Sequence, residues 1–192
     1  MTIRQRFFLS AGLGLAVFGM VAHAATISLA MDFPTVIQQD FDVQVQVTDV
    51  FAGRDPGDAL LAYGFNVTVG SGLVTYVGED AGPLFTDFSA SFGGNPAVAG
   101  ISNSILGLSS GDFAEPLTLA ILHFTANGLG ATSIGVTYDP GDLNQGLFYL
   151  NSIEPISASR QIDVTPEPAT FALAGLALAA LCVAGVRRGR KA

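Results

Sequence analysis

The chain has 192 residues, of which 49% are hydrophobic, and carries eight basic residues against sixteen acidic ones. Between residues 25 and 165 only Arg54 and Arg160 are basic against fifteen acids, a formal charge of −13. The length fits one main domain, and so acidic a surface repels nucleic acid and anionic lipid. The single cysteine, Cys182, lies in an apolar C-terminal segment, which excludes a disulfide in the domain before it.

The N-terminus has the three parts of a secretory signal peptide. A positive start is followed by an uncharged apolar run over residues 7–21. We predict a signal helix within residues 1–24 and cleavage by signal peptidase after residue 24. The alternative is a retained anchor helix. The cleavage motif supplies the small residues that this enzyme requires, and the residues around the cut are Ala22, Ala24 and Ala25.

Residues 25–163 repeatedly alternate apolar and polar positions, which is typical of strands with one buried face. The run 117–126 is apolar on both faces, as a central strand would be. Residues 78–110 are rich in Gly, Ser and Asn and predict long loops with one or two strands. The pattern predicts an all-β fold, a β-sandwich or jelly roll of about nine strands. The other expected strands cover residues 27–31, 41–48, 61–69, 73–77, 134–138, 147–153 and 156–164.

The tetrapeptide Asp-Pro-Gly-Asp occurs twice, at residues 55–58 and at residues 139–142. Pro sets φ at the second position and Gly tolerates a positive φ at the third, so both copies predict type II turns.

The C-terminus again has three parts in order. Pro166, Glu167 and Pro168 predict an extended linker, because proline disfavours both helix and central strand. An uncharged run rich in Ala, Leu and Gly then predicts a single transmembrane helix over residues 170–186. The tail, residues 187–192, stays cytoplasmic by the positive-inside rule, and its charges are those of Arg187, Arg188, Arg190 and Lys191.

This arrangement behind a signal peptide resembles the PEP-CTERM sorting domain of Gram-negative bacteria, over residues 164–192. The resemblance implies recognition by exosortase, a membrane-embedded cysteine protease or transpeptidase that acts near residues 166–168. It implies an exported, inner-membrane-anchored precursor that is then deployed at the cell surface or in an exopolysaccharide biofilm matrix. Glu167 is then a recognition element and not a catalytic acid. The alternative is a single-pass anchor that is never processed.

The run 117–126 reads LTLAILHFTA and is followed by Gly128 and Gly130. Together with residues 62–75 it resembles cohesin-type modules, in which a strand of the form L-A-x-L-x-F-x-A precedes a Gly turn. The resemblance implies a nine-stranded jelly roll related to carbohydrate-binding modules. Residues 71–76 lack the Asp-Pro pair that usually follows the early strands of cohesins, so dockerin binding is not inferred.

Candidate catalytic residues are few, because His123 is the only histidine of residues 25–163 and no G-x-S-x-G elbow is present. We interpret His123 as structural, expect no catalytic residue and no enzyme activity, and keep a hydrolase as a minor alternative. Exposed aromatic side chains, tryptophan above all, usually bind polysaccharides, and this chain has no tryptophan. Tyr63, Phe65 and Phe124 lie at positions typical of the core. Exposed candidates are Tyr76, Tyr138 and Tyr149.

Oxygen-bearing side chains follow the second turn at Asp139, Asp142 and Asn144, and Ca²⁺ prefers such ligands. Their spacing matches no EF-hand loop, so we expect turn-forming residues, no metal and no cofactor, with Ca²⁺ as the alternative. The sequence predicts a non-catalytic surface or matrix protein that binds a protein or polysaccharide. A calcium-stabilised carbohydrate-binding module is the second hypothesis.

Overall fold

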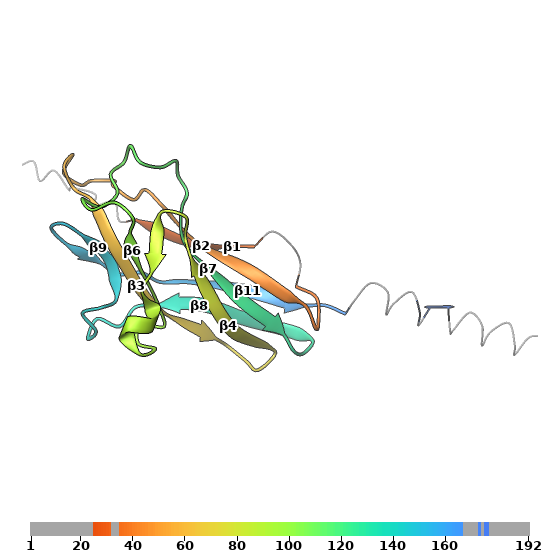
Figure 1. Cartoon of the computed structure of the whole chain (residues 1–192). Coiled ribbons are helices and arrows are strands. Elements are labelled where there is room, and N and C mark those ends of the chain that lie inside the picture. Colours follow the sequence, from red (N-terminus) through yellow and green to blue (C-terminus); the bar gives the residue numbers. More distant parts are fainter. Residues whose placement is uncertain (1–24, 32–34, 167–172, 174, 177–192) are drawn as a thin grey trace, which may run out of the picture.

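The computed structural model describes residues 25–31, 35–166, 173, 175 and 176. Within them the chain forms two facing antiparallel sheets (Figure 1). The first sheet has the strand order β1-β2-β7-β4. These strands are β1 (Thr26–Ala30), β2 (Asp40–Thr48), β7 (Leu117–Ala126) and β4 (Val74–Ala81).

The second sheet has the order β10-β9-β3-β6-β5, with β8 beside β3 and β11 beside β8. The long strand β3 pairs with β9 and β6 through its first half and with β8 through its second half. Apart from strands, residues 25–31 and 35–166 contain one short 3-10 helix, η1 (Ser89–Phe92). The strands are β3 (Leu60–Val69), β5 (Phe85–Asp87), β6 (Val98–Ser102), β8 (Gly130–Thr137), β9 (Gly146–Tyr149), β10 (Ile153–Glu154) and β11 (Ala158–Val164).

The core lies between the inner faces of the two sheets. Alternation places every second side chain of a strand inward, and β2 contributes Val43, Val45 and Val47, all fully buried. Phe124 of β7 and Phe65 of β3 are buried from opposite sheets. The all-β, two-sheet prediction is therefore confirmed, and the stretch 78–110 supplies two strands, β5 and β6, as expected.

Two details of the sequence prediction are wrong. The inner face of β7 is buried, but its outer face carries half-exposed residues such as Thr118, His123 and Thr125, so the strand is central without being covered on both sides. The apolar residues that suggested burial on both faces, including Ala120, lie near a register irregularity opposite Val45. A bulge at this point places neighbouring residues on one face and disturbs simple alternation.

The two Asp-Pro-Gly-Asp turns exist, but neither is of type II. In both, the last N–H donates to the first carbonyl, at 2.9 Å for Asp58 and 3.0 Å for Asp142. Neither Gly57 nor Gly141 has the positive φ that the third residue of a type II turn requires. The Asp139 side chain instead accepts a hydrogen bond from the Gly141 N–H at 2.8 Å. This Asx interaction, with Asp first and Pro second, favours a type I turn.

The expected signal helix of residues 1–24 lies outside the described residues. Of the predicted transmembrane segment, only residues 173, 175 and 176 are described, and these are helical. In the part of the chain that the structure describes, no helix combines the length and apolar character needed to cross a bilayer.

Candidate functional site

An apolar groove lies on the outer face of the second sheet, over β9, β3 and β6. Its floor consists of small side chains, Ala62 of β3 and Ala99 of β6, which leave the sheet surface low. Ile101 and Phe148 flank this floor from the neighbouring strands, since both pair with Ala62 across the ladder. The cavity measures about 200 Å³.

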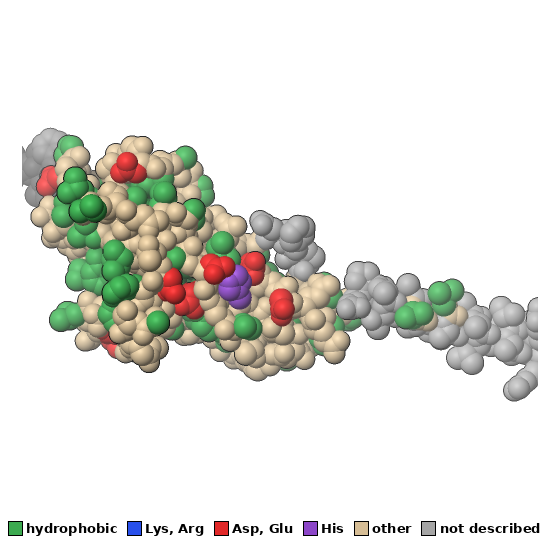
Figure 2. All heavy atoms as spheres, in the orientation of Figure 1, with side chains coloured by type: hydrophobic (Ala, Val, Ile, Leu, Met, Phe, Trp, Pro, Cys, Tyr) green, Lys and Arg blue, Asp and Glu red, His purple; other side chains and the backbone are tan. Residues whose placement is uncertain are grey.

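Two irregular segments form the walls of the groove. One wall comes from η1 and the residue before it, which bring Phe88 and Phe92 together at 6.0 Å between ring centroids. The other comes from the loop between β8 and β9, which contributes Leu143 and Asn144. Leu143 is 81% exposed and Phe88 42% exposed, so the groove presents apolar surface to solvent. Figure 2 shows hydrophobic side chains gathered on this side of the molecule.

A chain of three amides, from the buried Gln145 through the exposed Asn95 to the half-buried Asn66, holds the two walls in place. Gln145 is 1% exposed, and its Nε2 donates to Asn95 Oδ1 and to Asp142 Oδ2, each at 3.0 Å. Asn95 Oδ1 also accepts from Asn66 Nδ2 at 3.0 Å. The loop before β6, the loop before β9 and strand β3 are thus joined by side-chain hydrogen bonds. Such a network fixes the width of the groove before any ligand arrives.

Close backbone contact also shapes this wall. A Cβ built on Gly64 of β3 would lie 2.1 Å from the carbonyl oxygen of Asn144. Only glycine at residue 64 therefore lets the loop before β9 settle directly on the sheet.

Two acidic residues stand next to groove-lining residues in the sequence. The exposed Asp87 precedes Phe88, and Asp142 precedes Leu143. The Asn144 backbone N–H, with Gln145 and the Asn144 side chain, holds the pKa of Asp142 below its usual range, so this carboxylate stays charged. The groove itself is lined mainly by apolar side chains, so it suits a ligand that carries an apolar side chain.

The outer face of the first sheet has a different character. His123 lies there, with Nδ1 2.7 Å from Asp42 Oδ1 and Nε2 3.2 Å from Asp80 Oδ2. Figure 2 shows the histidine among acidic side chains on this polar face. The hydrogen bond to Asp42 is the main cause of a raised His123 pKa, with partial burial acting in the opposite sense. Both ring nitrogens are occupied by carboxylates, so neither is free to activate a nucleophile.

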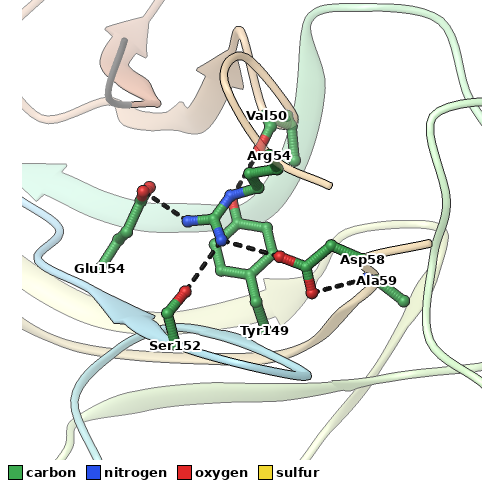
Figure 3. A network of polar contacts seen from close by, with 7 residues as sticks. All are labelled: Val50, Arg54, Asp58, Ala59, Tyr149, Ser152 and Glu154. Carbon is green, nitrogen blue, oxygen red and sulfur yellow. Dashed lines mark hydrogen bonds and ion pairs between the residues drawn. The ribbon is translucent and has the colours of Figure 1, made fainter. Parts of the chain in front are cut away.

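Arg54 occupies a separate, buried network at one end of the sandwich (Figure 3). Its Nη1 lies 2.9 Å from Asp58 Oδ2 and 2.9 Å from Ser152 Oγ, while Nη2 pairs with Glu154. The guanidinium carbon stands 3.2 Å from the centre of the Tyr149 ring. Tyr149 in turn donates to the Val50 carbonyl at 2.8 Å. The network joins the loop after β2 to β9 and β10, and its role is structural.

Tyr149 is 4% exposed, which corrects the expectation that it is a surface aromatic. Burial raises its pKa to about 12, against the opposing effect of the Arg54 charge. Tyr76 and Tyr138 are half-buried. Tyr63, Phe65 and Phe124 are buried as the core-like pattern predicts.

The candidate metal ligands after β8 use their oxygens within the loop. Asp142 Oδ1 accepts from the Asn144 N–H at 2.9 Å, and Asp139 Oδ1 accepts from the Gly141 N–H. Among the described residues, no group of three or more His, Cys, Asp or Glu side chains is arranged to hold a metal ion. The hydrogen bonds explain this loop as a pair of Asx turns. The expectation of no metal stays a prediction, with Ca²⁺ binding as its alternative.

The sequence did not lead us to predict the groove. Phe88 and Phe92 stand in a Gly- and Ser-rich stretch where no periodicity indicates their placement, and Leu143 lies in a polar turn. A usable signal was present, because several large apolar residues in otherwise polar loops are unexpected unless they bind something or cover the sheet.

Of the predicted sorting motif, only Pro166 is described, directly after β11. Glu167 and Pro168 lie outside the described residues, as do the tail residues Arg187, Arg188, Arg190 and Lys191. Of the predicted signal-cleavage residues, Ala22 and Ala24 also lie outside, and Ala25 stands just before β1.

Comparison with known families matches residues 164–191 to the PEP-CTERM protein-sorting motif. Together, the two-sheet domain and this motif define an exported all-β protein with a C-terminal sorting signal. A comparison of the sequence with curated proteins gives no significant match.

Structural neighbours of the chain are cohesin modules. One is the cohesin module of a family 33 glycoside hydrolase from Clostridium perfringens, at 8% identity and a TM-score of 0.46, with 74% of this chain and 98% of that one covered. Another is the sixth cohesin of scaffoldin B from Acetivibrio cellulolyticus, solved with a dockerin, at 14% identity, a TM-score of 0.43 and coverage of 72% and 99%.

A third is a type I cohesin–dockerin complex from Clostridium thermocellum, at 10% identity, a TM-score of 0.44 and coverage of 74% and 100%. The identities and scores are low, and the two-sheet architecture stated above rests on the strand pairing of this chain itself.

Proposed function

We propose that residues 25–165 form a non-catalytic protein-binding module that exosortase processes at the sorting motif and that acts at the cell surface or in the exopolysaccharide matrix. The apolar groove over β9, β3 and β6 carries the binding proposal. Soluble monomers bury most large apolar side chains, and an exposed apolar patch walled by ordered loops is typical of an interaction site.

The partner that fits is a protein segment with an apolar anchor side chain flanked by Lys or Arg. The groove volume of about 200 Å³ accommodates one or two side chains and not a folded domain. Both arginines of the described residues are engaged, Arg54 in its network and Arg160 with the Leu29 carbonyl at 2.8 Å. The formal charge of −13 over residues 25–165 then favours a basic partner and faster association with it.

The asymmetry between the two outer faces supports this choice of site. On the first sheet, polar side chains bond to each other, as in Thr125 Oγ1 to Asp40 Oδ1 at 2.6 Å and Gln46 Nε2 to Gln44 Oε1 at 2.9 Å. Such a face already satisfies its own hydrogen bonds. A flat glycan is usually held by several exposed aromatic rings, and among the described residues the only large aromatic side chain that is exposed, Phe88, lies at a wall of the groove.

A peptide array tests the proposal directly. The array carries extended peptides with a central Leu, Phe or Ala and flanking Lys or Glu, and the full-length protein in detergent is the probe. Binding is expected to peptides with a large apolar centre and Lys flanks. Ile101→Asp, which places charge beside the groove floor, should reduce binding at least about tenfold. Ser28→Asp, on the exposed outer face of β1, is the matched control and should bind as the unmodified protein does.

A glycan array with and without EDTA tests the second hypothesis. Peptide binding that Ile101→Asp leaves unchanged would count against the groove. Glycan binding that EDTA abolishes would replace the protein-binding proposal by a calcium-stabilised carbohydrate module.

A further inference from the structure

The folded domain holds the main chain right up to the sorting motif. β11 ends at Val164, and the next residue, Thr165, forms a parallel bridge with Val36. The Thr165 N–H donates to the Thr35 carbonyl at 3.0 Å, and the Thr165 carbonyl accepts from the Ile37 N–H at 3.0 Å. We call this contact, residues 35–37 with Thr165, the C-terminal clamp.

The clamp is fixed to the sandwich and not to a free loop. Residues 36–39 form a turn in which the Gln39 N–H donates to the Val36 carbonyl at 3.3 Å. Gln38 donates to the Ala126 carbonyl at the end of β7 at 2.8 Å, and Ala126 donates back to the Gln39 carbonyl at 3.1 Å. Thr35 is 3% exposed. The clamp therefore ties the end of β11 to the end of the first sheet.

The position of the clamp matters because the sorting motif starts inside the fold. The match to the PEP-CTERM motif begins at residue 164, where Val164 is 2% exposed. Pro166 is the first residue beyond the clamp. Enzymes that bind an extended peptide do so through its main-chain N–H and C=O groups, and those of Thr165 are already occupied by Thr35 and Ile37.

We propose that the C-terminal clamp is a positioning element for the processing reaction, and that its opening controls how fast the motif is cleaved. This inference rests on the proposed processing by exosortase. Cleavage itself breaks one peptide bond: the carbonyl carbon gains the hydroxyl of water, or an acceptor nucleophile in a transfer, and the leaving nitrogen gains a proton. While the clamp is closed, the chain before the motif lies against the sandwich edge, and the enzyme has no free residues on that side.

A flexible insertion after the clamp tests the inference while leaving the residues of the folded domain unchanged. Four residues, Gly-Ser-Gly-Ser, are inserted between Thr165 and Pro166 of the full precursor in a host that carries exosortase. Pulse-chase followed by mass spectrometry measures the initial rate of processing. The insertion should raise this rate roughly tenfold, the ratio expected if two main-chain hydrogen bonds no longer need to open. The same insertion after the exposed Gly72 is the control and should leave the rate unchanged.

A point substitution tests the clamp itself. Ile37 is the second residue of the turn, and Gln38, the third, has φ of 61°, which is the pattern of a type II turn that accepts Pro at residue 37. Ile37→Pro removes the donor to the Thr165 carbonyl and should raise the processing rate several-fold. Ile37→Ala keeps the N–H while removing most of the side chain, and should process at the unmodified rate.

The outcomes separate the clamp from the proposed function. If the unmodified precursor is not cleaved in the exosortase host, the proposed processing fails. If it is cleaved, and the insertion after Thr165 leaves the rate unchanged or lowers it, the clamp inference is overturned while processing stands. If Ile37→Ala accelerates cleavage as much as Ile37→Pro, side-chain packing and not the hydrogen bond holds the motif back, and the inference is again overturned.

Discussion

At the scale of single residues, Arg54 is the cation on which one end of the sandwich depends. Its side chain is 9% exposed, and that of its partner Asp58 is 5% exposed. Ions so far from water are tolerated only when paired and hydrogen-bonded. The Tyr149 ring beneath the guanidinium adds a cation–π contact.

Loss of Arg54 should therefore be severe. Arg54→Ala leaves the Asp58 carboxylate buried and Glu154 unpaired, and the free energy of unfolding should fall by about 3 kcal/mol. Urea unfolding followed by tyrosine fluorescence measures the change. Arg160→Ala is the control: Arg160 is exposed and donates to one carbonyl, so its loss should be below about 1 kcal/mol. Equal losses would mean that the network contributes no more than a surface arginine.

His123 makes stability depend on pH. Its pKa in the fold is raised above the ordinary value of 6.5, first by the hydrogen bond to Asp42. The folded state therefore binds the proton more tightly than the unfolded state does, and the stabilisation is fully present below 6.5 and lost as pH rises through the folded pKa. The advantage of the unmodified protein over His123→Gln should be larger at about pH 5.5 than at about pH 9. Paired thermal melts at both values measure it, and an advantage that grows with pH would contradict the sign.

Gln145 links the two loops that form the walls of the groove. Gln145→Leu keeps the volume but removes the hydrogen bonds to Asn95 and Asp142, which should loosen both walls. We expect about 1–3 kcal/mol lower stability, from the unpaired N–H of Asp139 and the lost bonds, together with weaker binding on the peptide array. Thermal melts and the array are run on the same preparation. Unchanged binding in a destabilised variant would show that the walls need no such support.

At the scale of elements, the passage from the first sheet to the second depends on Gly82. This residue follows β4, and its N–H donates to the Leu119 carbonyl at 2.7 Å. A Cβ at Gly82 would stand 2.0 Å from the Thr118 carbonyl oxygen, so no side chain fits where the chain crosses to β5. The contact is with backbone of the central strand, which cannot move aside without breaking its pairing.

Gly82→Ala should therefore lower the free energy of unfolding by about 2–3 kcal/mol through overpacking. Gly72→Ala is a matched control, because nothing lies within 4 Å of its built Cβ. Chemical unfolding of both variants provides the comparison, and a neutral Gly82→Ala would show that the corner relaxes freely.

At the scale of the whole molecule, the clamp places the boundary of the folded domain at Thr165. The sequence predicted a boundary after residue 163, within β11. A chain ending at residue 165 should unfold at the same urea midpoint as the full protein. A chain ending at residue 162 loses the buried Val164 and the Thr165 bonds, and should be less stable by about 2–3 kcal/mol. Equal midpoints for the two truncated chains would show that the clamp does not contribute to the stability of the fold.

Local patterns determined much of this protein. Two-residue alternation predicted most of the strands, and the order of Pro166, an apolar run and a basic tail predicted the sorting motif. These signals work because each depends on neighbouring residues alone. Even there, the type II prediction for the two turns was wrong, because the Asp139 side chain bonds Gly141 and favours the other turn.

Only the tertiary structure decided which outer face is suited to binding. Phe88, Leu143 and Ala62 are far apart in the sequence and meet because β3 pairs with both β6 and β9. The pairing of Arg54 with Glu154, of His123 with Asp42, and of Ile37 with Thr165 has the same origin. Alternation indicates which side chains point inward. Pairing between strands that are separated by long loops depends instead on the packing of the whole sandwich. This packing forms the groove and holds the start of the sorting signal at the edge of the sandwich.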